Sequence, residues 1–422
     1  MAASAHAPES ARSRRVCALV FLIFFVIALL TNVLAPLLPE LIRSFQLSLA
    51  MAGVLPFAFF IAYGIMSIPS GFLIDRFSEK PVLVSAFVLS LVAALAFALH
   101  PAYGMALVSL FAIGAGMAAL QVAINPLLRI SGGEEHFAFN SAVAQLIFAS
   151  ASAASPQMYS YLVRNTGKPG IFTSLAPPAL PWVALYWIFA AVSAAMVITI
   201  LAVRLPRVPL SEAEKPGPAS IYGKLLRNPV VLLYFASAFA YVGIEQGTSN
   251  WMSQFLATYH GFDPRTTGAN TVSEFWGGIA VGCLLGLALL KMFDERRVLI
   301  GASAAALAML TAALFGPPSV SVIAFPLIGL CISVMWPIVI ALALNSVTEA
   351  HGTLSGIMCT GIAGGALVPL IVGQIGDWLG LRAGMLFLYI PYCWVMGVGF
   401  WAKPIVHNRT IGASGSGVPF CD

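Results

Sequence analysis

About twelve apolar runs follow one another along this chain, each long enough to cross a bilayer as a helix, which takes about 20 residues. They lie at residues 16–38, 51–74, 81–99, 103–128, 137–162, 181–203, 228–257, 267–290, 297–316, 319–345, 352–376 and 383–402. The runs are apolar on all sides and longer than the ~10-residue alternating strands of a membrane β-barrel. Only 9% of the residues are charged, too few to cover a soluble fold of this size. The sequence therefore predicts an all-α membrane protein with twelve transmembrane helices and excludes a soluble enzyme.

The basic residues indicate how these helices are oriented. If the N-terminus is cytoplasmic, five of the 21 Lys and Arg residues lie outside and the other 16 (21 − 5) lie inside. The outer five are Arg43, Arg164, Lys168, Arg265 and Arg382. Cytoplasmic loops of membrane proteins carry an excess of Lys and Arg. We therefore expect a multi-pass protein of the inner (plasma) membrane with both termini in the cytoplasm.

One long polar stretch divides the runs into two sets of six. Residues 204–227 contain SEAEKPGPAS, a string rich in proline and small residues that is typical of a linker. We expect an N-terminal six-helix bundle at 1–203 and a C-terminal six-helix bundle at 228–402. The cytoplasmic linker is then 204–227, and a cytoplasmic tail follows at 403–422.

The two halves resemble each other. The string DRFSEKPVLV, which begins at Asp75, corresponds to KMFDERRVLI, which begins at Lys291, an offset of 291 − 75 = 216. Pro156 corresponds to Pro369, an offset of 369 − 156 = 213. Such similar offsets indicate a duplicated six-helix unit and hence two pseudo-symmetric bundles.

The loop after the second run carries a recognisable motif. GFLIDRFSEK resembles the signature G-x-x-x-D-R-x-x-x-K of the major facilitator superfamily and keeps Gly71, Asp75, Arg76 and Lys80. The resemblance implies a cytoplasmic gate, in which Gly71 lets two helices approach and Asp75 and Arg76 latch the bundle ends until they open inward. A solvated turn would explain the same charges, but the span count and the repeat favour the superfamily.

Several longer strings resemble one family within it, the fucose–galactose–glucose–proton symporters. They are ALQVAINPLL in the fourth run, YVGIEQG in the seventh, SEFWGG in the eighth, VMWPIVIALAL in the tenth and GGALVPLIVGQIGDWLG in the eleventh. The resemblance covers most of the chain. It implies that a sugar is carried across the inner membrane by alternating access.

The chain departs from the family pattern at two acidic positions. Asn32 stands where the first span of the family's proton symporters carries an acid, and Gln121 replaces a glutamate of the fourth span. An amide keeps the shape and the hydrogen-bonding capacity of the acid, but it cannot titrate. We therefore expect weak or absent proton coupling, as in a uniporter.

Polar side chains within membrane spans are costly and usually face the bundle interior. Those near mid-depth are Asn32, Gln121, Asn125, Gln145, Glu245, Gln246 and Asn250. Asn and Gln both donate and accept hydrogen bonds, as sugar hydroxyls do. Trp276 and Trp336 could stack on the apolar face of a sugar ring. We expect these nine residues to bind the substrate, although the amides could instead join one helix to another.

Two acids lie within the spans and are the candidates for proton coupling. Glu245 lies midway along the seventh run, where it would serve as a protonated donor or as the proton carrier. Glu274 lies nearer the outer end of the eighth run, where it could equally reach water. Sodium coupling through Asn32 and carbonyls near Pro36 is a third option, which no spacing supports.

Other functions fit the sequence less well. Efflux of drugs or metabolites on the same fold would use Glu245 or Glu274 within a more apolar cavity. All six histidines lie in loops or tails, and the sequence has no H-E-x-x-H, G-x-S-x-G or C-x-x-C string, so we expect no enzyme, cofactor or metal. Basic loops explain the net charge of +5 without a nucleic acid. We expect a monomer in the lipid bilayer that carries a neutral monosaccharide, with H⁺ or Na⁺ as a possible co-substrate.

Overall fold

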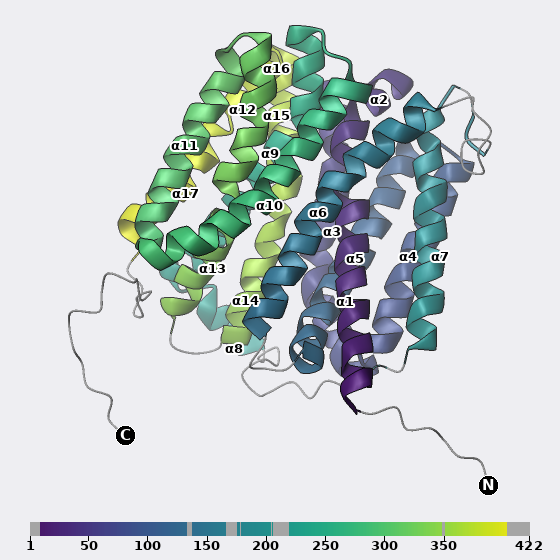
Figure 1. Ribbon diagram of the computed structural model, residues 1–422, viewed down its shortest axis with the longest axis vertical. Helices are drawn as coiled ribbons and strands as arrows, with labels where there is room; N and C mark the ends of the chain where they lie inside the picture. The colour runs from purple at the N-terminus through teal and green to yellow at the C-terminus, as the bar shows by residue number, and fades with distance from the viewer. Residues whose placement is uncertain are drawn as a thin grey trace.

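The computed structural model describes residues 9–132, 137–165, 175–177, 179–203, 205, 219–347 and 351–402. Within these residues every regular element is a helix, and the long helices run side by side (Figure 1). Each of the expected apolar runs coincides with a helix or a helix pair. The all-α prediction is therefore confirmed.

The first half of the chain supplies seven of the described α-helices. They are α1 (Glu9–Thr31), α2 (Leu34–Phe45), α3 (Leu49–Phe77), α4 (Glu79–Leu99), α5 (Tyr103–Gly132), α6 (Phe137–Arg164) and α7 (Ala184–Ala202), the last preceded by the 3-10 turn η2 (Pro181–Val183). α5 packs on α1, α3 and α4, while α4 also packs on α7 and α1 on α6. These helices form the purple-to-teal group of Figure 1.

The second half forms the teal-to-yellow group (Figure 1). After the short α8 (Ala219–Leu225) come α9 (Pro229–His260), the π turn η3 (Pro264–Gly268), α10 (Ala269–Met292), α11 (Glu295–Phe315), α12 (Pro318–Ile332), α13 (Met335–Asn345), α14 (His351–Thr360), the 3-10 turn η4 (Gly361–Ala363), α15 (Gly364–Leu379), α16 (Leu381–Leu386) and α17 (Tyr389–Trp401). α12 packs on α10 and α11, and α15 packs on α9.

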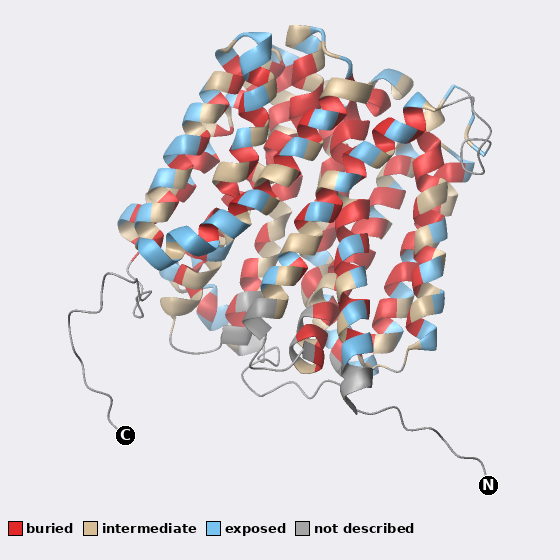
Figure 2. Ribbon diagram, in the orientation of Figure 1, coloured by how far each residue is buried: buried red, intermediate tan, exposed pale blue. Residues whose placement is uncertain are grey.

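Eleven stretches of the described helices are long and apolar enough to cross a membrane. The twelfth expected span is α6, a 28-residue helix that is more polar and packs between α1 and α10. Buried residues run through the centre of the molecule, and exposed residues lie mainly on its outer faces (Figure 2). Val281, Leu284 and Leu285 are among the large apolar residues that are exposed. An apolar outer surface suits contact with lipid.

Three spans are broken by a two-residue turn, and in each a proline lies four residues after the first broken position; the third break, at Phe387, precedes Pro391. α1 ends at Thr31 and α2 starts at Leu34, while α12 ends at Ile332 and α13 starts at Met335. A proline in a helix cannot donate to the carbonyl four residues earlier, and its ring clashes with that carbonyl. Pro36 and Pro337 lie four residues after Asn32 and Ser333, which are the broken positions. The first span therefore extends through its break to Phe45, beyond its expected end at residue 38.

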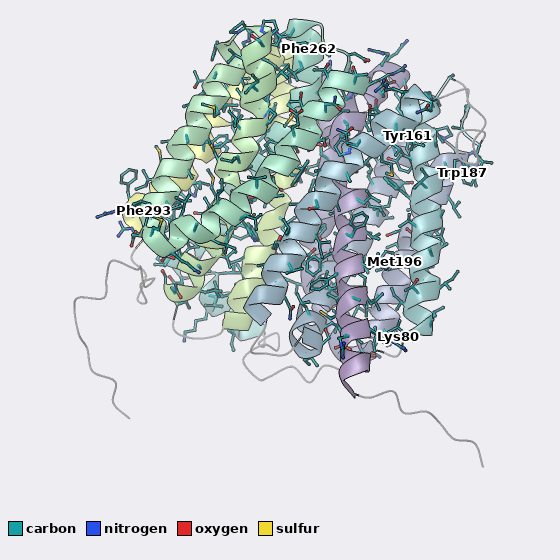
Figure 3. All side chains as sticks on the ribbon, in the orientation of Figure 1. Lys80, Tyr161, Trp187, Met196, Phe262 and Phe293 are labelled. Carbon is teal, nitrogen blue, oxygen red and sulfur yellow. The ribbon has the colours of Figure 1, made fainter. Side chains whose placement is uncertain are left out.

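The two ends of the molecule differ in charge. Lys80 lies at the end that we call the basic end, in the lower part of Figure 3. Arg76 in the last turn of α3 and Arg297 at the start of α11 belong to the same end. Glu40 on α2 and Asp377 on α15 lie at the other end, which we call the opposite end. Successive spans run in opposite directions, so the loops that connect them lie at the basic end and at the opposite end in turn.

Candidate functional site

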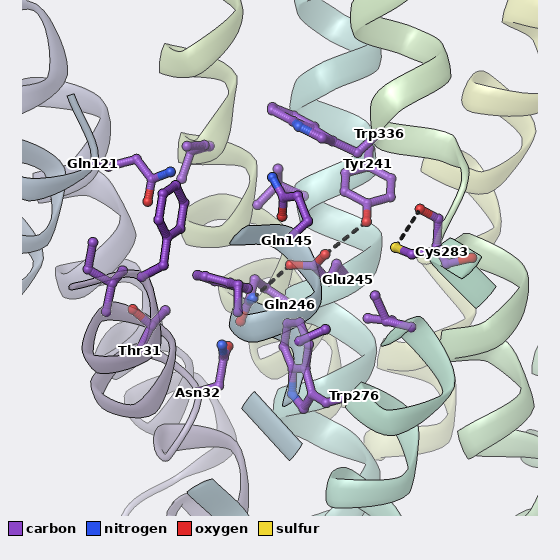
Figure 4. Close-up of a pocket in the computed structure, with 18 of the residues that line it drawn as sticks. Thr31, Asn32, Gln121, Gln145, Tyr241, Glu245, Gln246, Trp276, Cys283 and Trp336 are labelled. Atoms are coloured by element: carbon purple, nitrogen blue, oxygen red, sulfur yellow. Dashed lines mark hydrogen bonds between the residues drawn. The ribbon is translucent and has the colours of Figure 1, made fainter. Parts of the chain in front are cut away.

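A cavity of about 240 Å³ lies between the two halves, about midway along the spans (Figure 4). α1, α3, α5 and α6 form one wall, and α9, α10, α13 and η4 form the other. The polar or aromatic residues that line it include Thr31, Asn32, Tyr63, Gln121, Gln145, Tyr241, Glu245, Gln246, Trp276, Ser333 and Trp336. The cavity is thus amphipathic, with hydrogen-bonding groups on both walls.

Most of the residues predicted to bind substrate meet in this cavity. Seven of the nine line it, namely Asn32, Gln121, Gln145, Glu245, Gln246, Trp276 and Trp336. Asn250 is only 2% exposed and does not line the cavity. The side chain of Asn125 lies outside the described residues. The sequence thus identified the residue types, and the structure brings them together from six helices.

The first wall presents amides that are partly fixed by the protein. The amide nitrogen of Asn32, at the break after α1, donates to Ser152 Oγ at 2.8 Å and to the Ala28 carbonyl at 3.3 Å. The Tyr63 hydroxyl donates to Gln121 Oε1 at 3.3 Å, which leaves the amide nitrogen of Gln121 free to donate. Gln145 is exposed to the cavity and forms no side-chain hydrogen bond with the described residues.

The second wall carries a hydrogen-bonded row along α9. Glu245 accepts from the Tyr241 hydroxyl at 2.9 Å and from Gln246 Nε2 at 3.1 Å (Figure 4). Asn250 Nδ2 donates to the main-chain carbonyl of Gln246 at 2.8 Å and to its Oε1 at 3.3 Å. Asn250 therefore lies behind the cavity and fixes the orientation of Gln246, because it holds the amide oxygen and directs the nitrogen toward Glu245.

Aromatic rings complete the second wall. The ring centroids of Tyr241 and Trp336 lie 5.6 Å apart, and those of Phe275 and Trp276 lie 5.7 Å apart in an edge-on pair. Trp336 lies next to Pro337, one turn after the break at Ser333. The break thus places Trp336 at the cavity (Figure 4). Indole rings offer the flat apolar surfaces on which sugar rings can pack.

The two predicted coupling acids occupy different environments. Glu245 is the one acid among the described residues that line the cavity, and no Lys or Arg accompanies it there. Both of its oxygens accept hydrogen bonds, one from Tyr241 and one from Gln246. Glu274 is exposed on α10, one heptad before the exposed Val281, and does not line the cavity.

The predicted gate residues at the basic end make contacts within the first half. Lys80 Nζ donates to the carbonyls of Leu201 (2.9 Å) and Val203 (2.8 Å), at the C-terminus of α7 (Figure 3 labels Lys80). A cation suits this position, because the last carbonyls of a helix carry partial negative charge. The Arg76 guanidinium lies 5.4 Å from the ring centroid of Phe77. Gly71 lies within α3, and the Asp75 side chain is outside the described residues.

The opposite end carries contacts that join the two halves. Arg265 of η3 pairs with Glu40 of α2 through two hydrogen bonds, Nε to Oε1 at 2.6 Å and Nη2 to Oε2 at 3.2 Å. The Asp377 carboxylate accepts from the main-chain nitrogens of Leu49 (2.7 Å) and Ala50 (2.9 Å), at the start of α3. Ser160 Oγ also donates to the Arg265 carbonyl and Ser273 Oγ to the Ala153 carbonyl, both at 2.6 Å, on this side of the cavity. These contacts close the molecule at the opposite end.

Sequence reasoning missed the contacts of four of these residues, Tyr241, Glu40, Arg265 and Asp377. Tyr241 precedes Glu245 by four residues, a spacing that places both on one helix face and could have indicated the contact. Glu40 and Arg265 are 225 residues apart, and Asp377 and Leu49 are 328 residues apart. No local pattern predicts pairs so far apart, and only the packing of the halves brings them together.

A helical membrane protein built from two halves around a polar cavity, closed at one end, has the architecture of a solute transporter. The chain belongs to the Major Facilitator Superfamily, whose family model matches residues 20–369. This confirms the superfamily resemblance drawn from the loop motif GFLIDRFSEK. The solved E. coli fucose:proton symporter has the same fold, with a TM-score of 0.66 and 22% identity over 92% of this chain and 98% of that one.

Curated relatives match almost the whole chain. A glucose/galactose transporter of Brucella abortus is 29% identical over 388 residues, 90% of this chain and 92% of the relative. The L-fucose-proton symporter of Escherichia coli K12 is 25% identical over 392 residues, 86% of this chain and 87% of the relative. A bacterial homologue of the lysosomal transporter Spinster, solved facing inward, has a TM-score of 0.71, 15% identity and coverage of 94% and 98%.

Proposed function

We propose that this protein moves a neutral monosaccharide across the inner membrane by alternating access. The observation that carries the proposal is the lining of the central cavity. Its four amides, Asn32, Gln121, Gln145 and Gln246, face it from both halves, and two tryptophans lie beside them. Each amide can donate and accept, which matches a ring of hydroxyl groups. The names of the relatives, glucose/galactose transporters and an L-fucose-proton symporter, support the same substrate class.

The size of the cavity separates this proposal from drug efflux. Sites for drug-sized ligands typically measure about 300–1,000 Å³, whereas this cavity measures about 240 Å³. One carboxylate and four amides interrupt its apolar lining and offer hydrogen bonds to a solute from both walls. A small polar solute therefore fits better than a lipophilic cation.

We interpret the structure as the state of the transport cycle in which the opposite end is closed. In our proposal the basic end faces the cytoplasm, since Lys and Arg favour that side, and both termini lie there. Residues 1–203 and 228–402 then rock as two bundles joined by the linker 204–227, with 403–422 as the tail. In the other state the opposite end opens, and Asp75 and Arg76 latch the basic end. We propose that a monomer performs this cycle.

We further propose that proton coupling is weak or absent. The first wall carries Asn32 and Gln121 where acids would be expected, and amides do not exchange protons. A second candidate is proton symport through Glu245. The observation in its favour is that Glu245 is the one acid among the described lining residues and lies beside the tyrosine hydroxyl of Tyr241.

Uptake into proteoliposomes tests the substrate. Purified protein should take up labelled glucose or galactose, and Gln145→Leu should raise the KM about tenfold, the effect of one lost hydrogen bond to a sugar hydroxyl. Gln254→Leu is the matched control, because Gln254 lies on α9 outside the cavity and bonds to Thr258 (3.1 Å). Uptake of lipophilic cations in place of sugars, or equal sugar uptake by wild type and Gln145→Leu, would contradict the proposal.

An imposed proton gradient tests the coupling. Uptake should stop at equal sugar concentrations on both sides, whether or not a gradient is present. Accumulation above equilibrium that Glu245→Gln abolishes would contradict uniport and identify Glu245 as the coupling residue. Gln121→Glu supplies the reverse test, since it restores a titratable acid on the first wall and should introduce gradient-driven accumulation. Counterflow of sugar under both conditions reports substrate binding separately from coupling.

A further inference from the structure

A second hollow, which we call the lateral groove, lies on the outside of the second half. It measures about 380 Å³ and runs between α10 and α11, with α12 and the break at Ser333–Val334 as its floor. Gly282 and Leu289 of α10 face Arg297, Gly301 and Ala305 of α11 across it. From Arg297 to Ala305 the groove follows α11 for about 12 Å, at 1.5 Å per residue.

Small side chains keep this groove open. α10 and α11 both pack on α12 but touch each other little. A methyl group added at Gly301 would meet no atom within 4 Å. Leu285 and Leu289 are 50% and 41% exposed although they are apolar. The groove is therefore a concave apolar surface on a face that α10 and α11 turn away from the central cavity.

One free cation lies at the mouth of the groove. Arg297 is the one charged residue that lines the groove, is exposed, and forms no ion pair with the described residues. Its neighbour Arg296 is committed, because its Nε and Nη2 donate to the carbonyls of Gly399 and Phe400, both at 2.9 Å. Asp294 is likewise committed, as it accepts from the Arg296 main-chain nitrogen at 3.0 Å. Arg297 is thus available to an anion from outside the protein.

We propose that the lateral groove binds one acyl chain of an anionic phospholipid from the leaflet at the basic end, with Arg297 at its phosphate. The apolar length suits a hydrocarbon chain, and the cation lies where the helix ends and the headgroup region begins. Basic residues at the ends of transmembrane helices are known to recruit anionic headgroups. A planar arginine can bind two phosphate oxygens at once.

The position of the groove gives the bound lipid a way to influence transport. Ser333 lines both the lateral groove and the central cavity, so the broken segment between α12 and α13 separates the two. Val334 lies against Gly286 of α10, and Trp336 faces the central cavity two residues later. A chain in the groove would therefore hold the break that positions Trp336.

Native mass spectrometry of the full-length protein tests the binding. The probes are phosphatidylglycerol and phosphatidylcholine with identical acyl chains, added at equal concentrations. We expect the wild type to retain phosphatidylglycerol about tenfold more than phosphatidylcholine, the effect of one charge-assisted contact. Arg297→Gln should remove this preference, and Gly301→Phe, which fills the groove, should remove retention of both lipids.

Matched variants keep the test decisive. Lys291→Gln removes an exposed cation at the same end but outside the groove, and it should leave the preference unchanged. Gly277→Phe adds the same ring on α10, where an added methyl also meets no atom within 4 Å but which lies outside the groove. If Arg297→Gln keeps the wild-type preference, or Lys291→Gln loses it equally, the proposal is wrong. Retention by Gly301→Phe equal to that of Gly277→Phe would overturn it as well.

Discussion

The two ends of the molecule use similar chemistry for different purposes. At the opposite end, Asp377 caps the start of α3 and Glu40 pairs with Arg265, and both contacts cross from one half to the other. At the basic end, Asp294 caps α11 and Lys80 caps α7, and both contacts stay within one half. A charge meets a helix end in three of these four contacts, and the fourth is an ion pair, but only the first set disappears when the halves separate.

This difference determines what each contact controls. A contact within one half is present in every state of a rocking transporter, so it changes stability but cannot favour one state over another. A contact between the halves exists only while that end is closed, so its free energy adds directly to the conformational equilibrium. The opposite end should therefore set the balance of the two states, and the basic-end caps should set the stability of each half.

The largest effect is expected from a glycine at the interface of the halves. A methyl group at Gly373 of α15 would overlap the carbonyl oxygen of Leu49 in the other half. We expect Gly373→Ala to destabilise the closed opposite end by about 1–3 kcal/mol, a shift of about 5- to 150-fold. Hydrogen exchange at the Leu49 and Ala50 amides measures it, because these amides are bonded to Asp377 only while this end is closed.

Gly329→Ala is the control for this substitution. Its added methyl would overlap the carbonyl oxygen of Phe275, which lies in the same half. The variant should lower the melting temperature without faster exchange at Leu49 and Ala50. Equal acceleration in both variants would show that exchange there reports general stability, and the distinction between the ends would fail.

A smaller effect is expected from the ion pair. Glu40→Gln removes the charge that Arg265 contacts through two nitrogens, while the Glu40 side chain is 5% exposed. Hydrogen bonds to charged groups contribute about 1.5 kcal/mol to stability at the lower end of their range. The lower value applies here because the Arg265 side chain is 38% exposed. We therefore expect a roughly tenfold shift toward the state open at the opposite end, measured by the same exchange.

Arg43→Gln supplies the comparison for this pair. Arg43 approaches Glu40 to 3.9 Å, but it lies on the same helix and is 66% exposed. Exposed pairs contribute about 0–1 kcal/mol, and this one is present in both states. A shift as large as that of Glu40→Gln would mean that the charge of Glu40, rather than its partner across the interface, determines the effect.

The helices and the cavity residues could be predicted from the sequence because their causes are local. Long apolar runs specify spans wherever they occur, and the breaks follow from Pro36 and Pro337 acting on the residues four positions earlier. The first span was expected to end at residue 38, two residues before the charged Glu40. The helix continues to Phe45, and Arg265, far along the chain, pairs with Glu40 within it.

The arrangement within the site could be predicted only in part. Sequence identifies amides as costly in a membrane and so places them in the interior, but it does not tell which of two amides faces the cavity. Gln246 and Asn250 lie one helical turn apart, and Gln246 lines the cavity while Asn250 supports it. That choice depends on how the two halves meet, which is also what pairs Asp377 with α3.

The smallest effect is expected from a helix cap, and a second cap of the same chemistry serves as its comparison. Asp377→Asn removes the negative charge that faces the N-terminus of α3, which typically contributes 0.3–1 kcal/mol, about 0.5 kcal/mol at an exposed site. A change of about 0.5 kcal/mol corresponds to a two- to threefold change in an equilibrium constant. We therefore expect a two- to threefold shift toward the state that is open at the opposite end. Asp294→Asn makes the same change at α11, so it should lower the melting temperature and leave exchange at Leu49 and Ala50 unchanged. If both variants shifted that exchange equally, caps within a half would also affect the equilibrium between states, and the two ends would have to be treated as one coupled gate.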